Sequence, residues 1–280
     1  MMNTDFCKIV EDLNKLGINK GDKVLIHSSY KSLGGVEGGP DTLFDALQEA
    51  VGDDGIIMFP TFTYSVCTAK NPVFDVKSTK THTGALPELF RHRPGVRRSV
   101  HPTHSLAVWG SNKDYYVDRH YEDNVCVAEN SPIMKLKDNG GKLLMLGCGI
   151  THNTLIHGAE CYVRAPYAFQ VDYSDPEFHR EYVTIDEDDV VRRQEFFHEF
   201  MEPYGYNQDY DKLATVMDIP KGYILKSESY LMDAKAVWDT VLETMKKDPY
   251  YFVCKDFSAL HRYSVTPLHP PFTTHVYSYT

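Results

Sequence analysis

Apolar residues recur along the chain at two spacings that alternate with each other. Spacings of three and four residues, which place side chains on one face of a helix, occur over 6–16, 41–51 and 233–249. Unbroken apolar runs, which are typical of buried strands, occur in KVLIHSS (23–29), GIIMFPTF (55–62) and GKLLMLGCG (141–149). Strands that alternate with helices predict an α/β fold with a central mixed sheet flanked by helices.

Shorter segments extend this pattern along the rest of the chain. Helices are predicted over 85–94, where Pro94 ends the helix, and over 130–136, 155–163 and 190–205. Strands are predicted over 99–110 and 179–186. The tail at 261–280 is rich in proline and aromatic residues, which predicts irregular coil. The whole chain, residues 1–280, is predicted to form one compact domain or two close subdomains, because its length allows one large core.

Composition narrows the classes of partner and the compartment. The formal charge of −10, from 39 acidic and 29 basic residues, argues against nucleic acid and favours a cationic small molecule. The six cysteines are scattered without a CxxC pair, which predicts reduced thiols and a cytoplasmic protein. No run of 18 uncharged apolar residues occurs, so no membrane segment is expected.

The stretch GCGITHNTLIHGAE (147–160) carries the clearest candidate chemistry. A helix that begins near Asn153 or Thr154 places His157 and Glu160, three residues apart, on one face. A neutral imidazole accepts a proton, and a nearby carboxylate fixes its tautomer and stabilises the imidazolium, so the pair has the geometry of a general base. The alternative interpretation is a buried structural histidine. His152 is expected in the preceding loop.

Two further stretches carry polar or glycine-rich motifs. HSSYKSLGGVEGGPDT (27–42) runs into a helix, which suits either a phosphate-bearing ligand or a plain turn. SVHPTHS (99–105) holds His101 and His104, but Pro102 between them breaks helical ligand geometry. A zinc-dependent hydrolase that uses these histidines with His152 and His157 is the competing hypothesis. No GxSxG elbow is present to support a serine nucleophile.

Five stretches, taken in order, resemble the aminoglycoside 3-N-acetyltransferase family over about 5–166. They are VLIHSSYKSLGGVEGGPDTLFDAL, GIIMFPTFT, GALPELFRHRPGVRRSVHPTHSLAVWG, NSPIMKL and LLMLGCGITHNTLIHGAE. The resemblance implies acetyl-CoA as cosubstrate, no metal, and acetylation of the 3-amino group of 2-deoxystreptamine aminoglycosides. A polycationic aminoglycoside substrate also agrees with the acidic balance of the chain. From charge and the lack of long apolar runs we expect no nucleic-acid or membrane partner, and we expect a monomer or homodimer. The same chemistry on another amine and a non-catalytic coenzyme A-binding protein remain alternatives.

The resemblance also implies roles for individual residues. His157 matches the family's catalytic histidine, and Asp188 in the acidic run DEDD (186–189) matches its partner acid. Asp186, Glu187 and Asp189 are alternatives to Asp188, and Glu160 is either the partner or a substrate contact. The implied cofactor-binding residues are His27, Ser28, Ser29, Ser32, Leu33, Gly34, Gly35, Thr103, His104 and Ser105.

Overall fold

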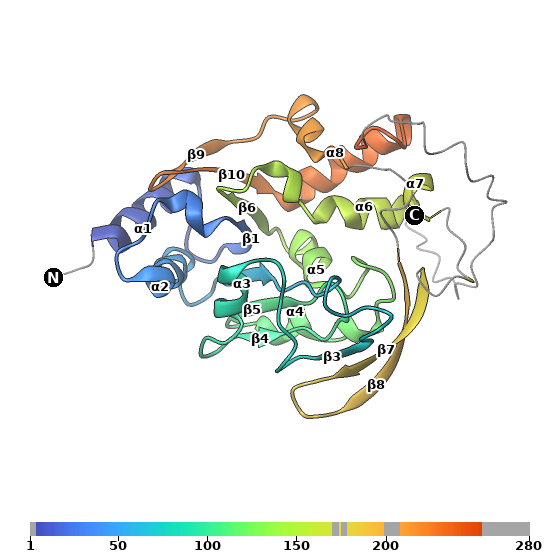
Figure 1. The fold of residues 1–280 in the computed structure, drawn as a ribbon. Coiled ribbons are helices and arrows are strands. Elements are labelled where there is room, and N and C mark those ends of the chain that lie inside the picture. The colour runs from blue at the N-terminus through green and yellow to red at the C-terminus, as the bar shows by residue number, and fades with distance from the viewer. Residues whose placement is uncertain (1–3, 170–173, 175–177, 199–207, 254–280) are drawn as a thin grey trace.

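A seven-stranded mixed sheet forms the centre of the molecule (Figure 1). The computed structural model describes residues 4–169, 174, 178–198 and 208–253. In spatial order the strands are β4 (Arg97–Arg98), β5 (Leu106–Gly110), β2 (Ile56–Pro60), β1 (Lys23–Ser28), β6 (Lys142–Leu146), β10 (Ser227–Asp233) and β9 (Lys221–Ile224). β1 is parallel to β2 and β6, and the other neighbouring pairs are antiparallel.

Helices cover both faces of this sheet because successive strand residues point to opposite sides. Leu25 of β1 and Leu143 of β6 pack into one apolar cluster, whereas Ile26 and Leu144 pack into another. The second cluster includes residues of α1 (Thr4–Leu16), α2 (Gly39–Val51) and α3 (Ala85–Phe90). The first includes residues of α4 (Lys113–Val117), α5 (Pro132–Asp138), α6 (Leu155–Val163), α7 (Pro166–Phe169) and α8 (Ala234–Lys247). The predicted α/β class is confirmed.

A second sheet of three strands stands beside the first (Figure 1). β3 (Val73–Asp75) is parallel to β7 (His179–Ile185), which forms a hairpin with β8 (Val191–Phe197). The helix predicted over 190–205 is therefore wrong at 191–197, and 199–205 lie outside the described residues. The buried side chains of Gln194 and Phe196 alternate with exposed Arg193 and Glu195, so pairing with β7 imposed the period of a strand.

The segment 208–233 supplies elements that the sequence pattern did not predict. It forms the 3-10 helix η5 (Tyr210–Thr215) and the hairpin of β9 and β10, which extends the central sheet along β6. Within the described ranges, no helix is both long and apolar enough to cross a membrane. The tail predicted as coil, 261–280, lies outside the described residues, and the single domain stays a prediction.

Candidate active site

Four loops meet at one edge of the central sheet. β1, β2 and β6 are parallel, so their carboxyl ends lie together, and the antiparallel strand β5 begins at the same edge. The adjoining loops are 29–35, 61–63, 99–105 and 147–154. Ligands of open α/β sheets bind at this edge. The fold therefore gathers the serine, glycine and histidine motifs that are far apart in the sequence.

His157 and Glu160 face each other on α6. Asn153 Oδ1 accepts a hydrogen bond from the Leu155 N–H (3.2 Å) and anchors the start of this helix. His157 Nδ1 lies 2.9 Å from Glu160 Oε2. The Glu160 side chain is fully buried, whereas 19% of the His157 side chain is exposed. The predicted shared face is confirmed, and it pairs an accessible imidazole with a buried carboxylate.

Two tyrosine hydroxyls complete the surroundings of Glu160. Tyr210 Oη lies 2.7 Å from Glu160 Oε2 and 2.8 Å from His157 Nδ1, and Tyr167 Oη donates to Glu160 Oε1 (2.6 Å). Sequence reasoning missed both tyrosines. A hydroxyl donor has no fixed spacing from its acceptor, and Tyr210 lies 53 residues beyond His157, so no local pattern marks it.

His27 is buried near the His157 imidazole at the end of β1. Burial, with a smaller effect of charge on His152 and His157, lowers the pKa of His27 to about 3. Among the described residues, neither His27 Nε2 nor Ser28 Oγ has a hydrogen-bond partner. Unpaired buried polar atoms are rare in folded proteins and fit a place where a ligand supplies the partner. His152 is exposed and ends the 3-10 helix η3 (Ile150–His152), as expected of a loop residue.

The serines of the 27–35 loop hold the strand ends together. Ser29 N–H donates to Leu146 O (2.8 Å), which continues the pairing of β1 with β6. Ser32 Oγ donates to Ser29 O (2.6 Å) and lies 2.6 Å from Ser227 Oγ. These two hydroxyls crowd Gly147, where an added Cβ would lie 1.9 Å from Ser32 Oγ. The Ser32 hydroxyl is therefore a structural contact in this fold.

The rest of this loop divides into a core residue and an open turn. Leu33 ends the 3-10 helix η1 (Tyr30–Leu33) and is 1% exposed, so its side chain belongs to the apolar core. Gly34 and Gly35 have φ values of 79° and 94°, which glycine adopts without strain. No atom lies within 4 Å of a Cβ built on Gly35. The backbone there is open to close approach by a ligand.

His101 is engaged by the backbone through both ring nitrogens. Its Nδ1 accepts a hydrogen bond from the His104 N–H (2.8 Å), and its Nε2 lies 3.2 Å from Val125 O. Burial lowers the pKa of His101 to about 3. Among the residues that the structure places, no group of three or more His, Cys, Asp or Glu is arranged to hold a metal. The geometry of His101 therefore does not suit the competing zinc site.

The other predicted residues of the 99–105 segment differ in their surroundings. The His104 ring packs against Phe62, at 4.6 Å between ring centroids, and lies 6.5 Å from the His157 ring. The Thr103 hydroxyl lies 2.9 Å from His104 Nδ1. Ser105 Oγ accepts from Arg98 Nε (3.0 Å) inside the core, so that hydroxyl is structural. His104 therefore borders the His157 imidazole, and Thr103 contacts His104.

Asp188 lies away from His157, contrary to the implied partnership. It occupies the exposed β7–β8 turn, which is at the lower edge of Figure 1, whereas α6 crosses the middle. Its N–H donates to Asp186 Oδ1 (2.9 Å). The neighbouring acids pair with basic residues of that region: Asp186 with Arg192, Glu187 with Arg97, and Asp189 with Lys77. The hairpin extends this turn away from the sheet edge, and the carboxylate beside His157 is that of Glu160.

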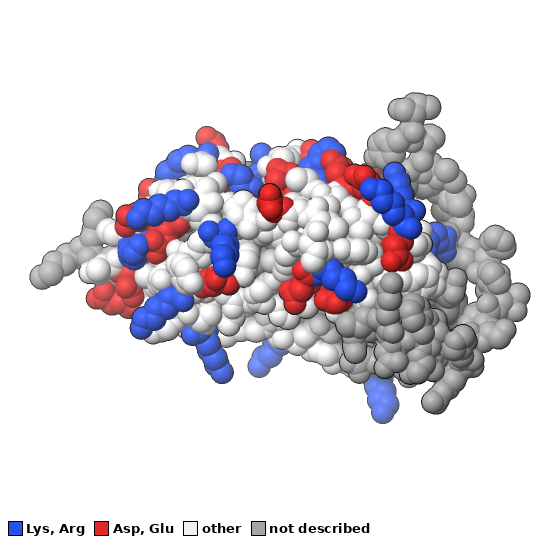
Figure 2. Space-filling view, turned by 90° about the horizontal axis from the view of Figure 1, so that it is seen from above, with Lys and Arg blue, Asp and Glu red and all other residues white. Residues whose placement is uncertain are grey.

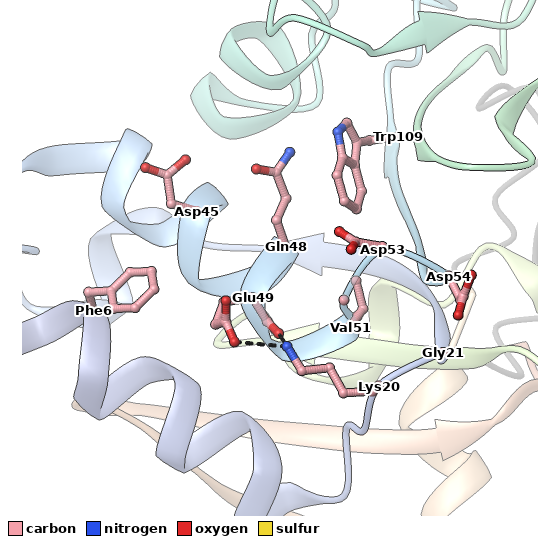
Figure 3. A pocket seen from close by; sticks show the side chains of 11 residues that line it. Phe6, Lys20, Gly21, Asp45, Gln48, Glu49, Val51, Asp53, Asp54 and Trp109 are labelled. Carbon is pink, nitrogen blue, oxygen red and sulfur yellow. Dashed lines mark hydrogen bonds and ion pairs between the residues drawn. The ribbon is translucent and has the colours of Figure 1, made fainter.

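A separate hollow lies at the opposite edge of the sheet (Figure 3). Its walls include Gln48 and Glu49 of α2, Lys20 before β1, Asp53 before β2, and Trp109 of β5. These positions adjoin the amino ends of β1 and β2, so the hollow is remote from the carboxyl ends that carry His157. On the face shown in Figure 2, basic and acidic side chains are interspersed. The negative charge of the chain is therefore not gathered in one patch on that face.

This mixed sheet, with a histidine and a carboxylate at the carboxyl ends of its parallel strands, defines a class of α/β protein with a candidate acid-base site. The family model for aminoglycoside 3-N-acetyltransferases matches residues 25–246, and the chain belongs to that family. The resemblance found in the sequence motifs is confirmed.

Three known proteins show how far the similarity extends. Aminoglycoside N(3)-acetyltransferase VIII of Streptomyces fradiae is 33% identical over 186 residues, which cover 60% of this chain and 65% of that protein. Aminoglycoside N(3)-acetyltransferase VII of Streptomyces paromomycinus is 33% identical over 203 residues, covering 66% and 68%. The matched segments thus span about two thirds of these relatives. The structure of AAC-IIIb with CoASH is 26% identical, with a TM-score of 0.72, and covers 86% of this chain and 96% of that chain.

Proposed function

We propose that the protein is an acetyl-CoA-dependent N-acetyltransferase that modifies the 3-amino group of 2-deoxystreptamine aminoglycosides. The observation that carries this proposal is the contact of His157 Nδ1 with the buried carboxylate of Glu160 (2.9 Å). Family membership and the CoASH-bound relative support the choice of cosubstrate. The curated relatives, both named aminoglycoside N(3)-acetyltransferases, support the acceptor.

In this mechanism His157 acts as the general base. Nδ1 of the neutral imidazole carries the proton directed at Glu160, which leaves Nε2 to take a proton from the acceptor amine as its nitrogen bonds to the acetyl carbon. Glu160 then stabilises the imidazolium at close range. The bond between the acetyl carbon and sulfur breaks, and the thiolate that leaves takes the proton from the His157 imidazolium, so that coenzyme A is released as the thiol and the imidazole is neutral again. Glu160 takes the role that the sequence resemblance implied for Asp188.

The residues at the sheet edge suit a coenzyme A thioester, whose acetyl group is activated for attack by an amine. His27 Nε2 and Ser28 Oγ are buried polar atoms that lack a partner among the described residues, and amide groups of a pantetheine arm can pair with both. We assign Gly34, Gly35 and the start of α2 to the phosphates. The backbone at Gly35 is open, the Lys226 side chain lies against Gly34, and the N–H groups at a helix start bind anions.

The compartment proposed for this reaction is the cytoplasm. The six cysteines are scattered along the chain without a CxxC pair. This cysteine usage is typical of proteins from a reducing compartment.

Thiol release from acetyl-CoA, measured with chelator present, tests the proposal. Gentamicin-like 2-deoxystreptamine drugs are compared as acceptors with polyamines and aminosugars. Release with the drugs, and 3-N-acetyl product by mass spectrometry and NMR, is expected. Release with polyamines or aminosugars but not with the drugs would show that the acceptor is a different amine. Acetyl-CoA binding without release from any amine would refute catalysis.

His157→Ala is the variant that tests the base. It is expected to lower kcat by about 10²- to 10⁴-fold, because the attacking amine loses its proton acceptor, while acetyl-CoA binding by calorimetry is unchanged. His92→Ala serves as the matched control, since the His92 side chain is 57% exposed and lies at the end of α3. Wild-type turnover in His157→Ala would remove His157 from the mechanism.

A further inference from the structure

Tyr210 contacts both members of the proposed catalytic pair. Its hydroxyl oxygen lies 2.8 Å from His157 Nδ1 and 2.7 Å from Glu160 Oε2, and these two atoms lie 2.9 Å apart. We propose that Tyr210 is a positioning residue that, together with Tyr167, fixes the Glu160 carboxylate and so keeps the neutral His157 imidazole protonated on Nδ1. This inference rests on the proposed function, in which Nε2 is the atom that takes the proton.

The number of protons in this triangle decides the tautomer of His157. The Tyr210 hydroxyl has one proton, and two acceptors lie within reach of it. If that proton points at His157 Nδ1, the imidazole proton must lie on Nε2, and Nε2 cannot act as a base. If it points at Glu160, Nδ1–H donates to the same carboxylate and Nε2 is the basic nitrogen. Hydrogen bonds to an ionised acceptor are the stronger ones, which favours the second arrangement.

Tyr167 holds the other carboxylate oxygen. Its hydroxyl donates to Glu160 Oε1 (2.6 Å), so both oxygens of a fully buried side chain have tyrosine donors. Burial and the charge of Glu160 raise the pKa values of Tyr167 and Tyr210 far above the ordinary range. Both hydroxyls therefore stay protonated as donors. A carboxylate bound at each oxygen cannot rotate without breaking a buried hydrogen bond, which is unfavourable because the donor left behind stays buried without a partner.

The segment that carries Tyr210 is itself fixed by backbone contacts. Asp209 N–H donates to Phe252 O (2.8 Å), and Lys212 Nζ donates to Tyr251 O (3.0 Å) and Val253 O (2.9 Å). These bonds tie the start of η5 to the chain just beyond α8. Tyr210 is buried, with 2% of its surface exposed, and its aromatic ring lies 5.4 Å from that of His157. A rigidly held hydroxyl can set a tautomer, whereas a mobile one cannot.

NMR of the wild-type protein, labelled with ¹⁵N at histidine, tests the inference. The tautomer of His157 is measured in the unmutated protein, so no substitution can disturb the site. Histidine ¹⁵N shifts distinguish Nδ1–H from Nε2–H, and comparison with His157→Gln assigns the His157 signals. Nδ1–H is expected for the neutral His157 imidazole. An Nε2–H signal at His157 in the wild type would overturn the inference, whether or not the protein proves to be an acetyltransferase.

Tyr210→Phe then tests the effect on the reaction. Removing the hydroxyl is expected to lower kcat by about 10-fold or more, since it supports a base worth about 10²- to 10⁴-fold. KM for acetyl-CoA and for the amine should stay within about 2-fold of the wild-type values. A lower kcat with unchanged KM indicates that the variant impairs the base and leaves substrate binding intact. The Nδ1–H fraction of His157 should fall, and Tyr167→Phe should give a smaller loss of kcat.

Tyr182→Phe is the matched control. It also removes a buried tyrosine–histidine contact, between Tyr182 Oη and His198 Nε2 (2.9 Å), but touches neither His157 nor Glu160. It should leave kcat and the His157 signals unchanged. Wild-type kcat and an unchanged His157 tautomer in a folded Tyr210→Phe protein would refute the positioning role. Turnover that survives His157→Gln would instead refute the proposed base.

Discussion

At the scale of single residues, the contacts of His157 show which of its neighbours can be predicted from residue spacing in the sequence. The three-residue interval to Glu160 predicts a shared helix face, and the two side chains are 2.9 Å apart. The expectation for Asp188 came from family resemblance through a loosely matched turn. That turn is exposed, and its acids pair with Arg192, Arg97 and Lys77. Local helix geometry was the more reliable guide to the acid that contacts His157.

Glu160→Gln and Asp188→Asn distinguish these two acids in a kinetic assay. The Gln amide can donate to His157 Nδ1, which favours the Nε2–H tautomer and removes the charge that stabilises the imidazolium, so a loss in kcat of about 10²-fold is expected. Asp188→Asn should stay within about 2-fold of wild type, because an exposed charge remote from the reaction contributes little. A larger loss in Asp188→Asn than in Glu160→Gln would reverse the assignment.

Gly147→Ala tests the close packing between the strand ends. Gly147 has a φ of 65°, and the added methyl carbon would lie 1.9 Å from Ser32 Oγ and 2.0 Å from Ser227 Oγ. Gly140→Ala is the control, since Gly140 has a similar φ of 67° but no atom within 4 Å of its Cβ position. Urea unfolding should show Gly147→Ala less stable than the control by about 1–3 kcal/mol. Equal stabilities would show that the hydroxyls move aside without cost.

At the scale of elements, long amphipathic segments were predictable and the β7–β8 hairpin was not. The helix at 233–249 agrees with α8, and the apolar runs agree with β1, β2 and β6. The sequence of β8 is rich in charged and aromatic residues and is compatible with either a helix or a strand. Seven residue pairs with β7 decided in favour of a strand, and this pairing is long-range information that a local window lacks.

The start of α8 offers a test of local helix signals. Asp233 Oδ1 accepts a hydrogen bond from the Ala236 N–H (2.7 Å) and so caps this helix. Asp233→Ala is expected to reduce the free energy of unfolding by about 1 kcal/mol. Asp239→Ala removes an exposed acid of the same helix that pairs with Lys235, and should cost less than about 0.5 kcal/mol. Chemical denaturation measures the free energy of unfolding of both variants. Equal losses of this free energy in Asp233→Ala and Asp239→Ala would contradict the capping role of Asp233.

At the scale of the whole molecule, the fold buries histidines around the sheet edge in uncharged form. Burial lowers the pKa of six described histidines below the ordinary value of 6.5. The pKa falls to about 3 in His27, His101 and His198, and it is also lowered in His82, His104 and His120. Burial also raises the pKa of Asp123 to about 7. The folded state thus binds fewer protons than the unfolded state at mildly acid pH, because six histidines outweigh one carboxyl.

This imbalance predicts acid lability. A histidine with a lowered folded pKa contributes its full stability above pH 6.5, and that stability is lost as the pH falls from 6.5 towards 3, by up to about 1.4 kcal/mol per pH unit and group. Asp123 has the opposite effect, since its stabilisation is lost as the pH rises from about 4 to 7. Urea unfolding should therefore give a lower midpoint at pH 5.5 than at pH 7.5. A midpoint that is constant or higher at pH 5.5 would contradict burial of these histidines as neutral groups.

The sequence by itself determined the fold class, the main strands and helices, the family and the pairing of His157 with Glu160. Each of these depends on side chains a few residues apart, where the period of a helix or strand fixes which residues share a face. Tertiary structure alone decided the strand at 191–197, the remote position of Asp188, and the place of Tyr210 beside His157. Those outcomes depend on contacts between distant segments, and chain packing brings such segments together without leaving a regular spacing in the sequence.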